Sequence, residues 1–147
     1  MSFSRTWDGL PVAEEPPFGA MVVVFRRAGE DIELLVLHRR AAGPPGYEGD
    51  WAWTPPSGAR VPGEAVDACA SRELAEETGL DLECLRVDDG LEWAIYVAEA
   101  PSDATVILDA EHDASRWLPA RGALALCRPE VVADHLRIAV EAIEHAR

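Results

Sequence analysis

Acidic side chains recur at fixed spacing in one glycine-led segment, which reads GARVPGEAVDACASRELAEETGL from position 58 to position 80. If its second half is helical, Glu73, Glu76 and Glu77 share one flank within roughly a 100° arc, because residues three and four apart are surface neighbours. Like charges at these spacings repel each other on a bare helix. Hard carboxylate oxygens suit Mg²⁺ or Mn²⁺. The spacing therefore predicts a divalent-metal site on a helix.

The rest of this segment must hold the acids in place. Val66, Ala70 and Leu74 have the i, i+4, i+8 spacing of an apolar helix face, which should pack on a sheet. Gly79 follows the last periodic position, where a helix end favours a left-handed residue. A solvated acidic helix face is the alternative interpretation. The metal site is favoured because the leading glycine, Arg72 and the terminating glycine all fall in register.

The complete pattern, G-x5-E-x7-R-E-U-x-E-E-x-G-U with U aliphatic, resembles the Nudix box at every defining position. The resemblance implies a hydrolase that cleaves nucleoside diphosphates linked to another group, with water and Mg²⁺ or Mn²⁺. It also implies an α/β fold, a Nudix-type α/β/α sandwich with the box helix packed on a mixed sheet. By the same resemblance, Glu73 and Glu77 are the principal metal ligands and Glu76 is a third. Arg72 orients a box carboxylate, and Glu64 is an outer acid that braces or joins the metal site.

Two flanking stretches narrow the resemblance. WTPPSG at 53–58 and EHDASRWL at 111–118 are similar to the asymmetric diadenosine tetraphosphate hydrolases. By that analogy Glu111 reaches the metal site or activates water, and either Glu76 or Glu111 takes the proton from the attacking water. The chain departs from that pattern at Ser57, Ala59 and Ser115, where relatives carry lysine, histidine and an aromatic residue. A nucleoside triphosphate pyrophosphohydrolase, a sugar-nucleotide hydrolase and a non-catalytic nucleotide-binding module therefore stay open.

Further substrate contacts are expected around the box. Basic side chains at the end of a predicted strand and in the box loop are candidate phosphate contacts, and nearby aromatic residues are candidate base contacts. The alternative is that the basic residues are solvated and the aromatic residues fill the core. The expected contacts are Arg39, Arg40, Arg60, Gly58, Tyr47 and Trp51.

The composition predicts one globular domain. The chain has 147 residues, 48% of them hydrophobic, which suits a single core. We expect an extended N-terminal lead-in at 1–18 and a single Nudix domain at 19–147. Apolar runs predict strands at 20–26, 32–38, 51–54, 82–87, 91–98 and 105–108, and helices at 120–126 and 130–146 beside the box helix.

The charge of the chain bears on its partners. The net charge of −14 argues against nucleic-acid polymers, which need a basic surface. No apolar run approaches the ~20 residues of a membrane span, and the N-terminus lacks the features of a signal peptide. We therefore expect a cytoplasmic protein whose partner is a small nucleotide substrate. Its 3 cysteines lack the paired spacing of a zinc site or disulfide framework. A homodimer stays open.

Overall fold

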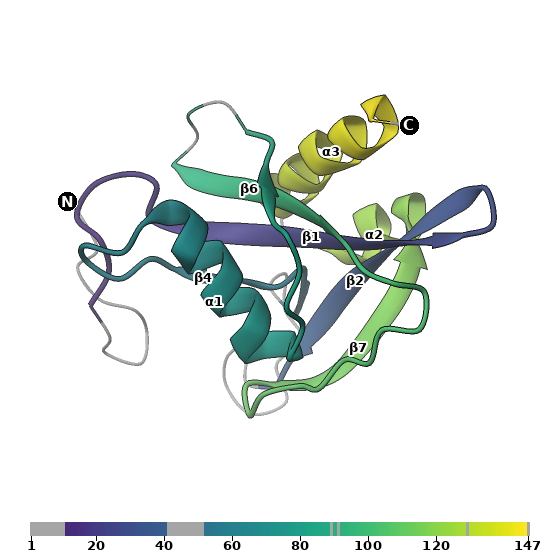
Figure 1. Cartoon of the computed structure of the whole chain (residues 1–147), viewed down its shortest axis with the longest axis horizontal. Helices are drawn as coiled ribbons and strands as arrows, with labels where there is room; N and C mark the ends of the chain where they lie inside the picture. Colours follow the sequence, from purple (N-terminus) through teal and green to yellow (C-terminus); the bar gives the residue numbers. More distant parts are fainter. Residues whose placement is uncertain (1–10, 41–51, 89, 91, 129, 147) are drawn as a thin grey trace.

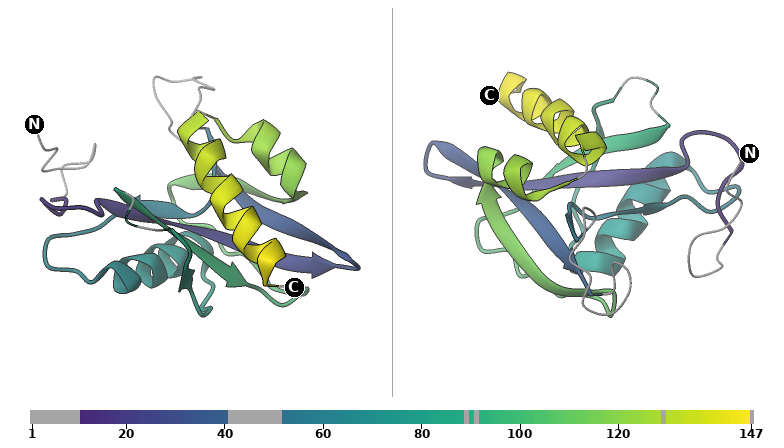
Figure 2. Two further views of the ribbon diagram at one scale, coloured as in Figure 1. Left: turned by 90° about the horizontal axis from the view of Figure 1, so that it is seen from above. Right: turned by 180° about the vertical axis from the view of Figure 1, so that it is seen from behind.

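The computed structural model describes residues 11–40, 52–88, 90, 92–128 and 130–146, which form a mixed β-sheet with helices on both faces (Figure 1). Helix α1 (Val66–Thr78) packs on one face, and α2 (Ala120–Leu126) and α3 (Glu130–His145) pack on the other. Figure 2 shows the two helical layers on opposite sides of the sheet. The predicted α/β/α sandwich, with the box helix on a mixed sheet, is confirmed.

The centre of the sheet is a hairpin of two long strands, β1 (Gly19–Ala28) and β2 (Asp31–Arg39). Both are nearly continuous apolar runs, as expected for strands that are covered on both faces. The connecting turn uses Gly29 at φ 68°, a conformation that glycine adopts without steric cost. β6 (Trp93–Glu99) lies parallel to β1, which makes the sheet mixed.

The remaining strands place the box loop and the edges of the sheet. β4 pairs with the first residues of β1, Gly58 opposite Ala20, and this brings the box loop beside the start of the central strand. β7 and β3 pair with β2, and β5 pairs with β6, all antiparallel. Their bounds are β3 (Trp53–Thr54), β4 (Ser57–Ala59), β5 (Leu85–Arg86) and β7 (His112–Pro119).

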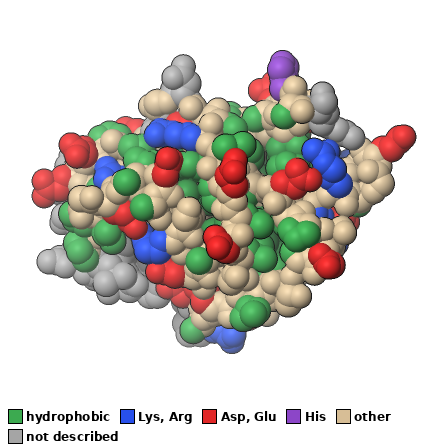
Figure 3. Space-filling view, viewed as in Figure 1, with side chains coloured by type: hydrophobic (Ala, Val, Ile, Leu, Met, Phe, Trp, Pro, Cys, Tyr) green, Lys and Arg blue, Asp and Glu red, His purple; other side chains and the backbone are tan. Residues whose placement is uncertain are grey.

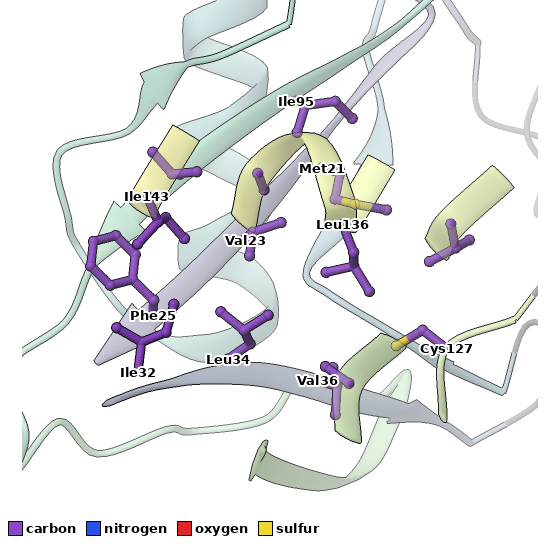
Figure 4. Close-up of a cluster of buried hydrophobic side chains, with 14 residues drawn as sticks. Met21, Val23, Phe25, Ile32, Leu34, Val36, Ile95, Cys127, Leu136 and Ile143 are labelled. Carbon is purple, nitrogen blue, oxygen red and sulfur yellow. The ribbon is translucent and has the colours of Figure 1, made fainter. Parts of the chain in front are cut away.

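Alternate residues of the central strands supply two separate cores. On β1, Val23 belongs to the cluster under α2 and α3, where it meets Leu34 and Leu136 (Figure 4). The adjacent Val22 points to the opposite face and belongs to the cluster under α1 with Leu35. All of these side chains are fully buried. The period of two along each strand therefore fixes which face carries the box helix.

Several predicted elements differ from the structure. The strands at 20–26, 32–38 and 91–98 and both later helices are confirmed. The strand predicted at 105–108 is wrong, because that stretch is irregular and crosses the face that α1 covers. The strand predicted at 82–87 is shorter in the structure, where only β5 (Leu85–Arg86) forms. Strands β4 and β7 were not predicted. Within the described ranges, none of the helices combines the length and apolarity that a membrane span needs.

Candidate active site

Helix α1 holds the acids of the box at a fixed rotation. It ends at Gly79, which lies at φ 72° and whose N–H donates to a carbonyl one turn earlier. Ala70 and Leu74 are fully buried against the sheet, as the periodicity predicts. Because these two residues face the sheet, their neighbours Glu73 and Glu77 are turned toward the box loop.

Glu73 and Glu77 form a buried pair of carboxyl groups. Their exposed fractions are 8% and 4%, and the Ser57 N–H donates to Glu77 Oε1 at 3.1 Å. Burial, followed by the negative charge of Glu73, raises the pKa of Glu77 to about 10. Burial also raises the pKa of Glu73. Two carboxyl groups kept from water at such proximity cannot both ionise without compensation, so the pair favours a bound cation.

Arg72 braces this pair from outside. Its Nε and Nη2 donate to the two oxygens of Glu64 at 2.7 and 3.0 Å, and Nη2 also donates to the Ala59 carbonyl at 3.1 Å. Its Nη1 donates to Glu73 Oε1 at 2.9 Å. The Arg72 hydrogen bond lowers the pKa of Glu64. Arg72 therefore links the Glu64 carboxylate to the Glu73 carboxylate.

Glu76 does not join the buried pair. Its side chain is 56% exposed, and its contact with the others is through Arg72 Nη1, at 3.3 Å. Among the residues that the structure describes, no three His, Cys, Asp or Glu side chains converge into a metal cluster. Of the four residues predicted at the metal site, the structure thus groups Glu73 and Glu77 as a buried pair, with Glu64 joined to them through Arg72 and Glu76 outside. Mg²⁺ is commonly held by one or two carboxylates, water and substrate phosphates, and the oxygen-only Glu73–Glu77 pair fits that coordination.

Arg60 lies in a position that argues against the phosphate contact expected from the sequence. Its side chain is buried, with 7% of the residue exposed. Its guanidinium donates to the backbone carbonyls of Glu15, Pro17 and Glu64 at 2.9, 2.9 and 2.8 Å. These bonds tie the box loop to the N-terminal segment, so Arg60 acts on the loop itself.

The turn before β7 carries the acids outside the box. Arg40 holds this turn, since its backbone N–H donates to the Glu111 carbonyl at 2.8 Å and its Nε to the Ala110 carbonyl at 3.1 Å. The Glu111 side chain is exposed. Asp109 instead adds to the charges that raise the pKa of Glu77, and its Oδ1 lies 2.7 Å from Nδ1 of the buried His112. Asp109 was missed, because the sequence motif directs attention to Glu111.

The other expected substrate contacts are placed as follows. Gly58 lies against the Glu73 carboxylate, so its role is to let that side chain approach the loop. Arg39 ends β2, and its N–H donates to the Ala52 carbonyl at 2.8 Å. Tyr47 and Trp51 lie outside the described residues.

A cluster of aromatic and charged side chains lies where β2, β3 and β7 meet. The ring centroids of His38 and Trp53 are 4.9 Å apart, and the Arg116 guanidinium carbon lies 4.9 Å from the indole centroid. His38 Nδ1 is 2.6 Å from Asp113 Oδ1. Trp53 leads through Thr54 into the box loop, so this cluster joins that loop to the sheet.

Acidic side chains are scattered over the face that carries α1 (Figure 3), in keeping with the net charge of −14. Such a surface would repel a polyphosphate at long range. Favourable contacts to a phosphate chain must therefore be local, through a bound cation and a few arginines.

A family model described as NUDIX domain matches residues 15–137. The chain belongs to the NUDIX domain family. The match includes the whole box, the buried carboxyl pair and β7. The Nudix assignment made from the box spacing is therefore confirmed.

Two curated relatives are similar in sequence to this chain. An octanoyltransferase of Myxococcus xanthus is 29% identical over 137 residues, which is 84% of this chain and 37% of that protein. The chain thus spans little more than a third of that relative. The asymmetrical bis(5'-nucleosyl)-tetraphosphatase of Sus scrofa is 39% identical over 117 residues, 66% of this chain and 75% of the relative.

Solved structures share the fold. A C. elegans Ap4A hydrolase in a binary complex has a TM-score of 0.67 at 23% identity and covers 86% of this chain and 97% of its own. The E. coli dihydroneopterin triphosphate pyrophosphohydrolase has a TM-score of 0.66 at 20% identity, with coverage of 84% and 94%. These two enzymes differ in substrate, so the fold by itself does not select one.

Proposed function

We propose that this chain is a divalent-metal-dependent pyrophosphohydrolase. It cleaves a pyrophosphate bond in a nucleoside diphosphate linked to another moiety, with dinucleoside polyphosphates as the first class to test. The observation that carries the proposal is the buried Glu73–Glu77 pair, held against the box loop by Arg72. Such a pair is costly unless a cation offsets its charge.

The residues that would hold Mg²⁺ or Mn²⁺ are Glu73 and Glu77. Glu76, which faces solvent beside Arg72, would be a third ligand by the resemblance to the Nudix box, while Glu64 supports the site through Arg72. When bound, the metal would act as a Lewis acid that offsets the negative charge developing on the phosphate.

The protein's own residues have three tasks in the reaction. Arg72 fixes the position of the Glu73 carboxylate through a hydrogen bond. The Ser57 N–H fixes one oxygen of Glu77. A solvent-facing carboxylate, Glu76 or Glu111, takes the proton of the attacking water. The water oxygen then bonds to phosphorus, the bridging P–O bond breaks, and two phosphorylated products leave.

Support for a dinucleoside polyphosphate comes from the 39% identity to the pig tetraphosphatase and from the two flanking motifs. The substitutions at Ser57, Ala59 and Ser115 weaken that support, because they remove side chains suited to phosphate or base contact. The second candidate, hydrolysis of a single nucleoside triphosphate, therefore stays open. A module that binds a nucleotide without cleaving it is the candidate from another class.

A product assay in Mg²⁺ or Mn²⁺ separates these candidates. Release of ATP and AMP from diadenosine tetraphosphate would support the first. Release of pyrophosphate and a monophosphate from a triphosphate would support the second. Tight nucleotide binding with no product from any substrate, including sugar nucleotides, would favour the binding module and contradict the proposal.

A further inference from the structure

Arg60 is the point at which the N-terminal segment is fastened to the box loop. Two backbone bonds flank it: the Ala13 N–H donates to the Arg60 carbonyl, and the Arg60 N–H donates to the Phe18 carbonyl, both at 2.8 Å. Its guanidinium adds bonds to the carbonyls of Glu15 and Pro17. Ala13 itself is buried, with 2% exposed. The segment 13–18 therefore packs as a strap over the first half of the box.

The same guanidinium also reaches the residue that supports the metal-site arginine. Arg60 Nη1 donates to the Glu64 backbone carbonyl at 2.8 Å, while Arg72 binds both carboxylate oxygens of Glu64. The Glu64 carboxylate additionally accepts from the Val61 N–H at 3.2 Å, which closes the turn between them. Glu64 is thus held through its backbone by one arginine and through its side chain by the other.

The continuous path of contacts runs from the strap to the buried acids. Residues 13–18 hold Arg60, Arg60 holds the backbone of Glu64, Glu64 holds Arg72, and Arg72 holds Glu73. Each step is a hydrogen bond to an ionised group or by one, the stronger class of such bonds. An error in the position of Glu64 would therefore be passed to Glu73.

We infer that Arg60 and the strap 13–18 form a positioning unit that sets the affinity of the Glu73–Glu77 site for its divalent cation. The Arg60 guanidinium donates to backbone carbonyls, one of them that of Glu64, so Arg60 acts through Glu64 and Arg72. The inference rests on the proposed function, because it assumes that the buried pair is the metal site.

The test compares Arg60→Gln and Arg60→Lys with the wild type, using Mn²⁺ alone as the probe. Arg60→Gln removes the charge and most of the donors. Arg60→Lys keeps the charge but loses the planar set of donors, and it carries the test if the Gln variant fails to fold. The matched control is Arg26→Gln, because Arg26 is a half-buried arginine of β1 whose partners are Glu33 on β2 and the Trp117 ring on β7.

Mn²⁺ affinity is measured by electron paramagnetic resonance, and amide hydrogen exchange is measured on the metal-free protein. We expect Arg60→Gln to weaken Mn²⁺ binding by about 10- to 100-fold, as for other residues that support metal ligands. The Mn²⁺ affinity of Arg60→Lys should lie between those of Arg60→Gln and the wild type. Arg26→Gln should bind Mn²⁺ as tightly as the wild type does. Exchange should quicken at the Ala13 and Val61 amides in the Arg60 variants and stay slow in the control.

Unchanged Mn²⁺ affinity in folded Arg60 variants would overturn the inference, and a rise in KM alone would assign Arg60 to substrate phosphate. Different results would refute the proposed function and the role of Arg60. If the wild type hydrolyses no nucleotide but Arg60 substitution weakens Mn²⁺ binding, only the proposed activity is refuted. If the wild type binds no Mn²⁺, both are refuted.

Discussion

Replacing Gly58 by alanine would displace the Glu73 carboxylate while leaving the loop backbone in an allowed conformation. A Cβ at Gly58 would lie 2.1 Å from the carboxyl carbon of Glu73 and 2.2 and 2.3 Å from its oxygens. Gly58 is not among the glycines at positive φ, so the backbone itself accepts alanine. Close approach, and not chain conformation, is the reason for glycine here.

The expected effect follows from these distances. Ordinary contact begins near 3.4 Å, so the carboxylate must retreat by the difference from 2.1 Å, about 1.3 Å. A misplacement of about 1 Å can cost about 100-fold in rate, and we expect a loss of that size in kcat. The carboxylate is the end of a flexible side chain, so the cost in the free energy of unfolding should be about 1 kcal/mol, as for a strained rotamer.

The assay is the initial rate of AMP release from diadenosine tetraphosphate across a Mn²⁺ titration, together with thermal melting. The matched control is Gly122→Ala in α2, where the nearest atoms to an added Cβ lie at 3.6 Å. That control should keep full activity. A Gly58→Ala variant with the turnover and Mn²⁺ affinity of the wild type would refute the placement of Glu73.

Other substitutions test neighbouring parts of the site. Glu77→Gln should lose orders of magnitude in turnover at saturating Mg²⁺ with an unchanged circular dichroism spectrum, and near-normal hydrolysis would count against its role. Because the pKa of Glu77 is raised from 4.5 to about 10, its contribution to metal-free stability is complete below pH 4.5 and is lost as pH rises toward about 10. Melting temperatures in EDTA should therefore fall across this window, and less so in Glu77→Gln; equal slopes would contradict this. Asp109→Asn removes a negative charge that raises the pKa of Glu77, so the fall in melting temperature should level off at a lower pH; an unshifted curve would exclude this electrostatic interaction. Gly19→Ala should strongly lower the denaturant midpoint, since the new Cβ would lie 2.4 Å from the Gly58 backbone oxygen, which cannot swing aside; a wild-type midpoint would argue against this packing.

The helix of the box could be predicted in detail because its signals are local. The apolar spacing of Ala70 and Leu74 and the terminator Gly79 act within a few turns of one another, and all three are placed as expected. The helix period also put the acids on one flank. It could not show that the box loop covers Glu73 and Glu77 while leaving Glu76 in solvent, because β4 pairing with β1 sets the loop position.

The missed strands depend on partners that are distant in sequence. β7 is exposed at several positions, so its own pattern is weak, and it forms because β2 offers an edge for pairing. The opposite error occurred at 105–108, where an apolar run predicted a strand that the structure does not contain. There the Ile107 N–H donates to the Thr78 carbonyl at the end of α1, and its side chain is 67% exposed.

The role of Arg60 could not be predicted from the sequence either. An arginine in a loop beside a polyphosphate site suggests a phosphate contact from charge alone. The structure instead surrounds it with carbonyl oxygens from the N-terminal segment, which no local pattern in the sequence indicates.

A Mn²⁺ titration of the metal-free protein in weak buffer at about pH 7, with proton release recorded alongside binding, tests most directly whether the Glu73–Glu77 pair is the metal site. Since Glu77 keeps its proton at that pH and a carboxylate must be ionised to coordinate, the wild type should release about one proton per ion bound. Glu77→Gln should bind more weakly and release none. A wild type that binds no Mn²⁺, or that binds it as the variant does without releasing a proton, would contradict the claim that the buried carboxyl pair is the metal site.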